Sequence, residues 1–351
     1  MIAEDSSLFA EVLLELLSRE PGIEVLAVAE NGEEAVELCA KLRPDLILMD
    51  IHMPRLDGLS ATEAIMASTP TPILVLTADP HRGGVDLSFR ALSAGALDLM
   101  AKPNQFPLPL EDREKLLRKI HLLSQIPVVR HVRGRKRRDT PPPRVHSNSR
   151  PAVESLPPLV GIVASTGGPK ALARILQSLP KELPAAIIIV QHITDGFSLH
   201  LARWLNKHSP LQVRLAEGGE RPEAGHAYIA PTGMHLFLSS DGTLQVDESP
   251  PIGGHRPSGD RLLMSLARHG SSGAIGVVLS GMGDDGTAGL SAMHKSRCPT
   301  LAQDEETSVV YGMPRSAAEA GVVDQVLPDK RIAPHLIEII NDKLSSRKGE
   351  R

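Results

Sequence analysis

A segment near the middle of this chain cannot belong to a packed core, and it constrains the fold more than any other feature. Between Gln125 and Pro158 the sequence holds seven prolines and a basic cluster, with almost no repeating apolar pattern. Such a composition cannot bury enough apolar surface to offset the entropy lost on ordering. With 351 residues the chain is also long for one domain. We therefore expect a domain at 1–122, a flexible linker at 123–157, a second domain at 158–345 and a polar tail at 346–351.

The basic cluster in this linker allows two interpretations. It consists of Arg133, Arg135, Lys136, Arg137 and Arg138. One interpretation is a patch that binds nucleic acid or lipid, and the other is a solvated tether. We favour the tether, because the segment has no aromatic residues and the chain has a net charge of −4. A coil of this length spans on the order of 30 Å, so it would restrain two domains without fixing them.

Charge and composition exclude several classes of protein. A negative net charge gives no general attraction to nucleic acid or to an anionic membrane. Cys39 and Cys298 cannot form a disulfide framework, which favours a reducing compartment. No apolar run is long enough to span a bilayer, and the first residues do not resemble a secretory signal. We expect a cytoplasmic protein that neither inserts into membranes nor binds nucleic acid.

Both blocks that flank the linker alternate short apolar runs with amphipathic helical patterns, which is typical of doubly wound parallel α/β sheets. In the first block we expect strands at 25–29, 46–49, 73–77 and 97–100, with a further short strand before Glu4. Helices are expected after an N-cap at Ser6 or Ser7 and at 33–42, 58–67, 87–94 and 113–123. In the second block the strand candidates are 159–164, 186–190 and 274–279.

Polar side chains follow the strands of the first block. They are Glu4, Asp5, Asp50, Thr77 and Lys102. Functional groups of open α/β sheets gather beyond the carboxyl ends of the strands, so we expect these five side chains to converge. Three carboxylates suit Mg²⁺, and a central carboxylate can attack phosphorus. The lysine would balance the added charge, and the threonine would hydrogen bond a phosphoryl oxygen.

These residues lie in motifs that resemble the response-regulator receiver family over about residues 1–122. The motifs are EDS (4–6), LILMDIHMPRLDG (46–58), VLTA (75–78) and AKP (101–103). The resemblance implies a flavodoxin-like fold with Asp50 as phospho-acceptor and a histidine kinase as phosphodonor. It also implies Asp5 and the main-chain carbonyl of His52 as Mg²⁺ ligands, with Glu4 assisting through water.

The same resemblance implies that Thr77 and Lys102 form the switch pair, and that the Lys102–Pro103 peptide bond is unusual, with cis as the candidate geometry. The chain departs from the family at Leu99, where an aromatic residue is common. Only Met1, Ile2 and Ala3 precede the acidic pair, although a central first strand should run about five residues. We therefore expect either a natural start upstream or a locally destabilised receiver.

In the second block, Ser165 follows an apolar run and precedes two glycines and a helical pattern. A serine at such a junction places main-chain N–H groups near a developing oxyanion. A serine that only caps the helix, or a phosphate-binding turn, is about equally compatible with this segment alone. His192 follows the next strand and could accept the serine proton. Asp285 lies in a glycine turn after a third strand and could orient the imidazole.

The chain order Ser–His–Asp differs from that of the α/β-hydrolases, and Val163 stands where the G-x-S-x-G elbow has its first glycine. The histidines are scattered and include no HExxH zinc motif. An ordinary lipase of that fold is therefore excluded, and we expect no cofactor for this block.

Five motifs of this block resemble the protein-glutamate methylesterase catalytic domain of bacterial chemotaxis, over about residues 158–340. They are VGIVASTGGP (160–169), VQH (190–192), GHRPSGDRL (254–262), LSGMGDDG (279–286) and AQDEETSVVYGMP (302–314). The resemblance implies a Rossmann-like α/β esterase with Ser165 as nucleophile, His192 as general base and Asp285 as orienter. Asp284 falls at a variable position. Main-chain N–H groups of Thr166 and Met282 are the expected oxyanion donors. Val163 replaces a glycine that is usual in the family.

The resemblance further implies phosphorylation-activated hydrolysis of glutamate methyl esters on chemoreceptors, with deamidation of receptor glutamines by the same chemistry. A monomer is expected. A receiver with a DNA-binding output is disfavoured, because no helix-turn-helix pattern or basic recognition helix follows the linker. A non-catalytic scaffold of a chemosensory array is the other alternative, and an ester-hydrolysis assay would distinguish it.

Overall fold

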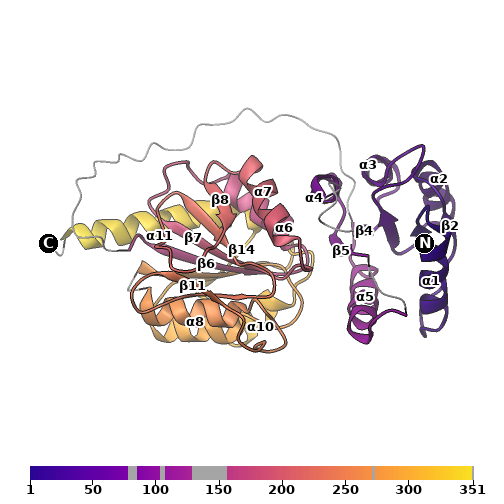
Figure 1. Ribbon diagram of the computed structural model, residues 1–351. Helices are drawn as coiled ribbons and strands as arrows, with labels where there is room; N and C mark the ends of the chain where they lie inside the picture. The colour runs from indigo at the N-terminus through magenta and orange to yellow at the C-terminus, as the bar shows by residue number, and fades with distance from the viewer. Residues whose placement is uncertain (78–84, 103–106, 129–155, 271–272, 350–351) are drawn as a thin grey trace. The chain divides into compact units, whose positions relative to one another are not determined.

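A computed structural model describes residues 1–77, 85–102, 107–128, 156–270 and 273–349. The chain divides into two compact units, Met1–Arg138 and Asp139–Arg351 (Figure 1). After the roles that the sequence motifs lead us to expect, we call them the receiver unit and the catalytic unit. Each is described separately below. The basic cluster of the linker and Pro103 lie outside the described residues. None of the described helices is long and apolar enough to cross a membrane.

In its described residues, the receiver unit is a five-stranded parallel sheet with five helices. Its strands are β1 (Ile2–Ala3), β2 (Val28–Ala29), β3 (Ile47–Asp50), β4 (Ile73–Thr77) and β5 (Asp98–Ala101). Its helices are α1 (Ser7–Ser18), α2 (Gly32–Leu42), α3 (Gly58–Ser68), α4 (Val85–Ala94) and α5 (Leu110–Leu123). The strand order β2-β1-β3-β4-β5 confirms the doubly wound, flavodoxin-like fold.

Local sequence explains most of these limits. The buried apolar runs of β3 and β4 match the predicted strands closely, and Ser6 proves to be the N-cap, accepting from the Phe9 N–H. Helix α5 begins three residues earlier than predicted, because Glu111 and Asp112 favour a helix N-terminus. Strand β2 is shorter than the predicted 25–29, since it pairs only with the two residues of β1.

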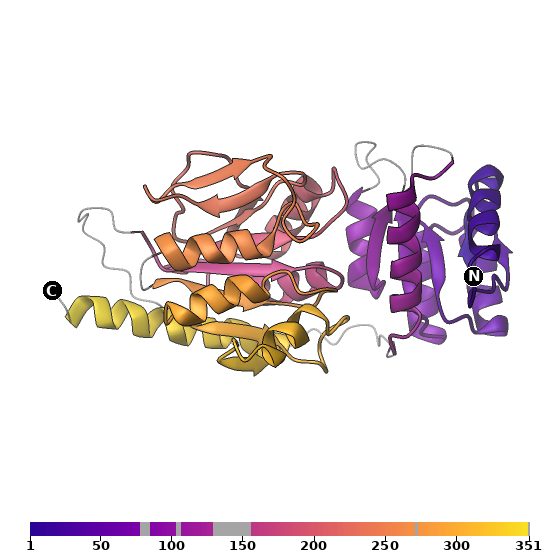
Figure 2. The ribbon, with the colours of Figure 1, turned by 90° about the horizontal axis from the view of Figure 1, so that it is seen from below.

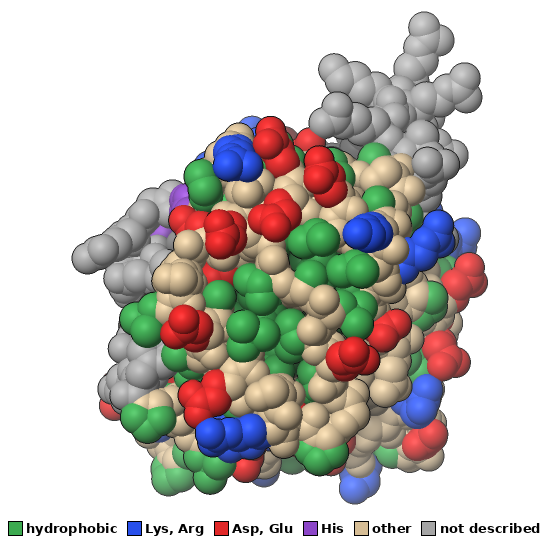
Figure 3. Space-filling model, turned by 90° about the vertical axis from the view of Figure 1, so that its right-hand side faces the viewer, with side chains coloured by type: hydrophobic (Ala, Val, Ile, Leu, Met, Phe, Trp, Pro, Cys, Tyr) green, Lys and Arg blue, Asp and Glu red, His purple; other side chains and the backbone are tan. Residues whose placement is uncertain are grey.

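The receiver unit also exposes large apolar side chains. Leu8 is 66% exposed and Leu26 is 43% exposed. Figure 3 shows a face of the molecule on which apolar side chains form a patch bordered by Asp and Glu.

The catalytic unit is built on a seven-stranded sheet in which every pair is parallel, in the order β14-β13-β12-β6-β7-β9-β8. Its strands are β6 (Leu159–Ala164), β7 (Ala186–Gln191), β8 (Gln212–Leu215), β9 (His226–Ile229), β12 (Ile275–Val278), β13 (Thr300–Gln303) and β14 (Gln325–Leu327). A separate antiparallel pair, β10 (His235–Leu238) and β11 (Leu244–Asp247), was not predicted from the sequence.

Helices cover both faces of this sheet. They are α6 (Gly168–Gln177), α7 (Ser198–His208), α8 (Gly259–His269), α9 (Thr287–Lys295), α10 (Met313–Glu319) and α11 (Asp329–Gly349). Helices α6, α7 and α11 lie on one face, and α8 and α10 lie on the other (Figures 1 and 2). Two helical layers around a parallel sheet confirm the predicted Rossmann-like α/β class. Helix α11 continues to Gly349, into the predicted polar tail.

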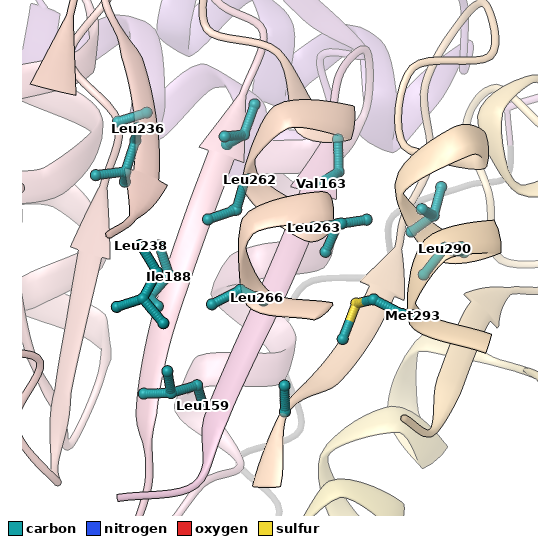
Figure 4. Close-up of a cluster of buried hydrophobic side chains, with 14 of the residues drawn as sticks. Leu159, Val163, Ile188, Leu236, Leu238, Leu262, Leu263, Leu266, Leu290 and Met293 are labelled. Atoms are coloured by element: carbon teal, nitrogen blue, oxygen red, sulfur yellow. The ribbon is translucent and has the colours of Figure 1, made fainter. Parts of the chain in front are cut away.

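The core of the catalytic unit is aliphatic. Leu262, Leu263 and Leu266 lie on one face of α8 and are fully buried against the sheet, where they pack near Val163 and Ile188 (Figure 4). Burying one leucine contributes about 1.5–3 kcal/mol. This packing fixes the N-terminus of α8 over the carboxyl ends of β6 and β12.

Candidate functional site

Four of the predicted site residues of the receiver unit lie close together at the carboxyl edge of its sheet. Ligand oxygens of Glu4, Asp5 and Asp50 lie within 4.8 Å of one another. Lys102 Nζ lies 2.9 Å from Asp50 Oδ2 and 2.7 Å from Glu4 Oε2. Three carboxylates at this spacing fit the oxygen ligands that Mg²⁺ prefers. The arrangement can hold a cation beside a buried carboxylate.

Thr77 is fully buried at the end of β4, and its carbonyl accepts from the Lys102 N–H at 2.7 Å. Burial raises the pKa of Glu4, although its hydrogen bond with Lys102 opposes that shift. His52 follows β3 by two residues and is exposed. The predicted unusual Lys102–Pro103 bond lies outside the described residues, and the expected aromatic position is the buried Leu99.

Ser165 lies at the point where the strand order of the catalytic sheet reverses. It follows β6, which is flanked by β12 on one side and β7 on the other. Such switch points are where ligands bind in doubly wound sheets. The Ser165 N–H donates to the Ser280 carbonyl at 3.0 Å, so the loop after β12 lies directly beside it. A Cβ on Gly281 would lie 2.7 Å from Ser165 Cβ, so this approach requires glycine.

His192 lies next to Ser165 because β6 and β7 are paired neighbours. The main-chain N–H of His192 donates to the Ala164 carbonyl at 2.9 Å. On its ring, Nε2 lies 2.8 Å from Asp285 Oδ2, while the buried Nδ1 has no hydrogen-bond partner. The described residues therefore contain no hydrogen bond between Ser165 and His192, and Nδ1 is the ring atom left to accept a proton. Catalytic hydrogen bonds often close only when substrate is bound.

Asp285 is held by the N-terminus of α8. Its carboxylate accepts from the Ser258 hydroxyl at 2.9 Å and from the N–H groups of Gly259 at 2.6 Å and Asp260 at 3.0 Å. Burial alone would raise the pKa of Asp285. The hydrogen bond and charge of His192, together with the main-chain donors, outweigh burial and hold the pKa at about 2. Asp285 is therefore ionised at neutral pH.

Acidification below about pH 4 is expected to destabilise the catalytic unit. The pKa of Asp285 is about 2 in the fold and 3.8 as its ordinary value, so the unfolded chain binds more protons. The corresponding stability, on the order of 2 kcal/mol, is present above about pH 4 and lost as the pH falls through about 2. The measurement is the free energy of unfolding of wild type and Asp285→Asn against pH. Their difference should shrink with acid, and a constant difference would contradict this account.

Two residues that hold the loops of this site in place were not predicted from the sequence. Gln191 Nε2 donates to the carbonyls of Ser165 at 2.7 Å and His192 at 3.0 Å, so one side chain ties the two loops together. Asp260 caps α9 by accepting from the N–H groups of Gly286 and Gly289. A polar residue that ends a buried strand was the available signal for Gln191. The S-G-D segment before a helical pattern was the signal for Asp260.

The two predicted oxyanion donors lie in neighbouring turns. Thr166 and Met282 follow Ser165 and Gly281 directly, and the Ser280 hydroxyl donates to the Thr166 carbonyl at 2.7 Å. Val163 leaves the strand undisturbed, since it pairs in register with Val190 and Val278. Its side chain fills space beside Gly259, where a Cβ would lie 2.2 Å from Val163 Cγ1. The departure from the family pattern is thus accommodated by packing.

Family models account for both units. Residues 160–336 match the CheB methylesterase model, and residues 1–109 match the response regulator receiver domain model. The first match covers half of the chain. The chain belongs to the CheB methylesterase family. Its receiver unit belongs to the receiver-domain family.

Similar proteins support this membership over nearly the whole chain. One is a "protein-glutamate methylesterase/protein-glutamine glutaminase 2" of Anaeromyxobacter dehalogenans, 46% identical over 97% of this chain and 96% of the relative. Another is a "protein-glutamate methylesterase/protein-glutamine glutaminase 3" of Myxococcus xanthus, 42% identical over 93% of this chain and 90% of the relative. The CheB methylesterase catalytic domain of Thermotoga maritima has a similar structure, with 42% identity and a TM-score of 0.51, over 53% of this chain and all of that one.

Proposed function

We propose that this chain hydrolyses methyl esters of glutamate on chemoreceptors by a Ser165–His192–Asp285 mechanism, and that it deamidates receptor glutamines with the same residues. The observation that carries the proposal is the bond between His192 Nε2 and an ionised Asp285, beside Ser165 at the switch point of the sheet. The names of the relatives in two bacteria support the substrate class.

In the first step, Ser165 Oγ attacks the γ-carbonyl carbon of the methylated glutamate. His192 Nδ1 accepts the serine proton, and the negative charge of Asp285 stabilises the imidazolium that forms. Main-chain N–H groups of Thr166 and Met282 would stabilise the oxyanion. The C–O bond to the methoxy group then breaks. Methanol leaves with the proton from His192, and the glutamyl group remains esterified to Ser165.

In the second step, a water molecule attacks the carbonyl carbon of the acyl-enzyme, and His192 accepts a proton from that water. The ester bond to Ser165 breaks, the serine recovers its proton and a free glutamate side chain leaves. A glutamine substrate follows the same path with ammonia as the first leaving group. The two substrates would therefore share one acyl-enzyme.

The receiver unit would control this activity through phosphorylation of Asp50 by a histidine kinase. An Asp50 oxygen attacks phosphorus and the bond to the kinase histidine breaks. Glu4, Asp5 and Asp50 would hold Mg²⁺ with the His52 carbonyl, and that ion supplies charge neutralisation for the phosphoryl oxygens. Lys102 already contacts Asp50, and Thr77 would complete the switch. The domain limits given above, a cytoplasmic location and a monomeric state remain predictions.

The test is methanol release from methylated chemoreceptor, measured with paired variants of the GMGDDG turn. Asp285→Asn is expected to lower the rate by about 10⁴-fold, because neutral Asn cannot stabilise the imidazolium or fix its tautomer. Asp284→Asn is the matched control and should change little, since Asp284 is exposed. If Asp284→Asn proves the costly change, the assigned orienter is wrong. If wild type releases no methanol, the non-catalytic scaffold replaces the proposed function.

A further inference from the structure

A second histidine lies flat against His192. The ring centroids of His192 and His255 are 4.2 Å apart, and the ring planes differ by 5°. His255 comes from the loop before α8 and is half-buried, whereas Asp285 approaches the edge of the His192 ring. One neighbour therefore contacts the face of the imidazole and another contacts its edge.

A short turn presents His255. The main-chain groups of Ile252 and His255 exchange two hydrogen bonds, at 3.1 and 2.9 Å. Gly253 and Gly254 between them have φ values of +58° and +81°, which is the backbone of a tight turn that favours glycine at both positions. The ring is therefore placed by a closed two-residue turn.

The segment that carries His255 also binds the carboxylate of Asp285. Three residues after His255, the Ser258 hydroxyl donates to Asp285, and the Gly259 N–H donates to it as well. The Ser258 N–H in turn donates to the buried ring of His235 at 3.2 Å, which anchors the segment to β10. The stretch of chain that contacts the face of the His192 ring thus also holds Asp285, which contacts its edge.

We propose that His255 is a positioning residue for ester hydrolysis, which sets the plane of the His192 ring and thereby the direction of Nδ1. This inference rests on the proposed function. A single hydrogen bond at Nε2 does not by itself fix the tilt of the imidazole plane. Stacking on a fixed ring sets this tilt, so the unpartnered Nδ1 keeps one direction. Misplacing a base by about 1 Å can cost on the order of 100-fold in rate.

The experiment measures kcat and KM for methanol release by three variants of the full chain. His255→Ala should lower kcat about 10- to 100-fold with KM nearly unchanged, because the base is misaligned while substrate binding is not. His255→Phe keeps a flat ring and should recover most of the lost kcat. His269→Ala is the matched control, since His269 is exposed at the far end of α8 and should behave as wild type.

Thermal unfolding of each variant separates misalignment from loss of fold. Wild-type kcat in a folded His255→Ala would overturn the proposal. So would a folded His255→Phe that is as slow as His255→Ala, because the ring plane would then not be what matters. If His255→Ala does not fold, the kcat of folded His255→Phe decides alone. A value near that of wild type supports the proposal, and a value about 10- to 100-fold lower overturns it. Absence of methanol release by wild type would instead refute the proposed function, so the two failures are distinguishable.

Discussion

Ser165→Ala is expected to lower methanol release from methylated chemoreceptor by at least about 10⁴-fold while the chain stays folded. The variant lacks the oxygen that forms the acyl-enzyme, and its smaller side chain fits in the space that the serine side chain occupied. The Ser165 N–H bond to Ser280 and the glycine contact at Gly281 involve only the main chain and Cβ, so they survive the change. The measurement pairs methanol release with thermal unfolding of both proteins.

His192→Ala should lose a similar amount, because nucleophile and base act as one unit. The double variant should then be hardly slower than either single variant. Losses that multiply in the double variant would mean that Ser165 and His192 contribute independently. A folded Ser165→Ala that keeps more than about a tenth of the rate would remove Ser165 from the mechanism.

Phosphorylation of Asp50 is expected to raise the rate of methanol release by the full chain about 10-fold or more. Both units belong to one chain, which raises their effective concentration, so even weak binding of the receiver unit to the catalytic unit would inhibit methanol release. A phosphoryl group on Asp50 adds up to two negative charges and draws in Lys102 and Thr77. Each tenfold shift in that equilibrium needs about 1.4 kcal/mol. The activation is measured as the rate of methanol release with and without acetyl phosphate and Mg²⁺.

Two proteins serve as controls for this activation. A fragment that begins at Pro157 should be as active as the phosphorylated full chain and insensitive to acetyl phosphate, because it lacks the receiver unit. Asp50→Asn should keep the low rate of the unphosphorylated chain under both conditions. If the fragment and the unphosphorylated chain are equally active, inhibition by the receiver unit is refuted. The receiver would then act by bringing the enzyme to its partners.

The sheets could be predicted because buried parallel strands are continuous apolar runs. The run at 159–164 and the run at 73–77 are strands at the predicted residues. Strand β2 was predicted too long, because its length is limited by the two residues of β1 rather than by its own sequence. The β10–β11 pair was missed, since each strand has only four residues and so short a pattern gives little signal.

The residues of the candidate site could be predicted from the sequence, but the contacts between them could not. Ser165 and His192 each follow an apolar run, and the ends of parallel strands meet at one edge. The order of the strands, which makes β6 a neighbour of both β7 and β12, depends on the whole fold. The placement of Asp285 on the N-terminus of α8 and the stacking of His255 join segments far apart in the sequence. No local pattern encodes such contacts.

Partitioning of the acyl-enzyme tests the central claim most directly. Hydrolysis is run in water that contains deuterated methanol, and the ratio of free glutamate to deuteromethyl ester is measured by mass spectrometry of the receptor peptide. A common acyl-enzyme on Ser165 predicts the same ratio from a glutamine substrate and from a methyl-ester substrate, since both leaving groups have departed before partitioning. Different ratios, or hydrolysis of both substrates without any deuteromethyl ester, would contradict a shared acyl-enzyme.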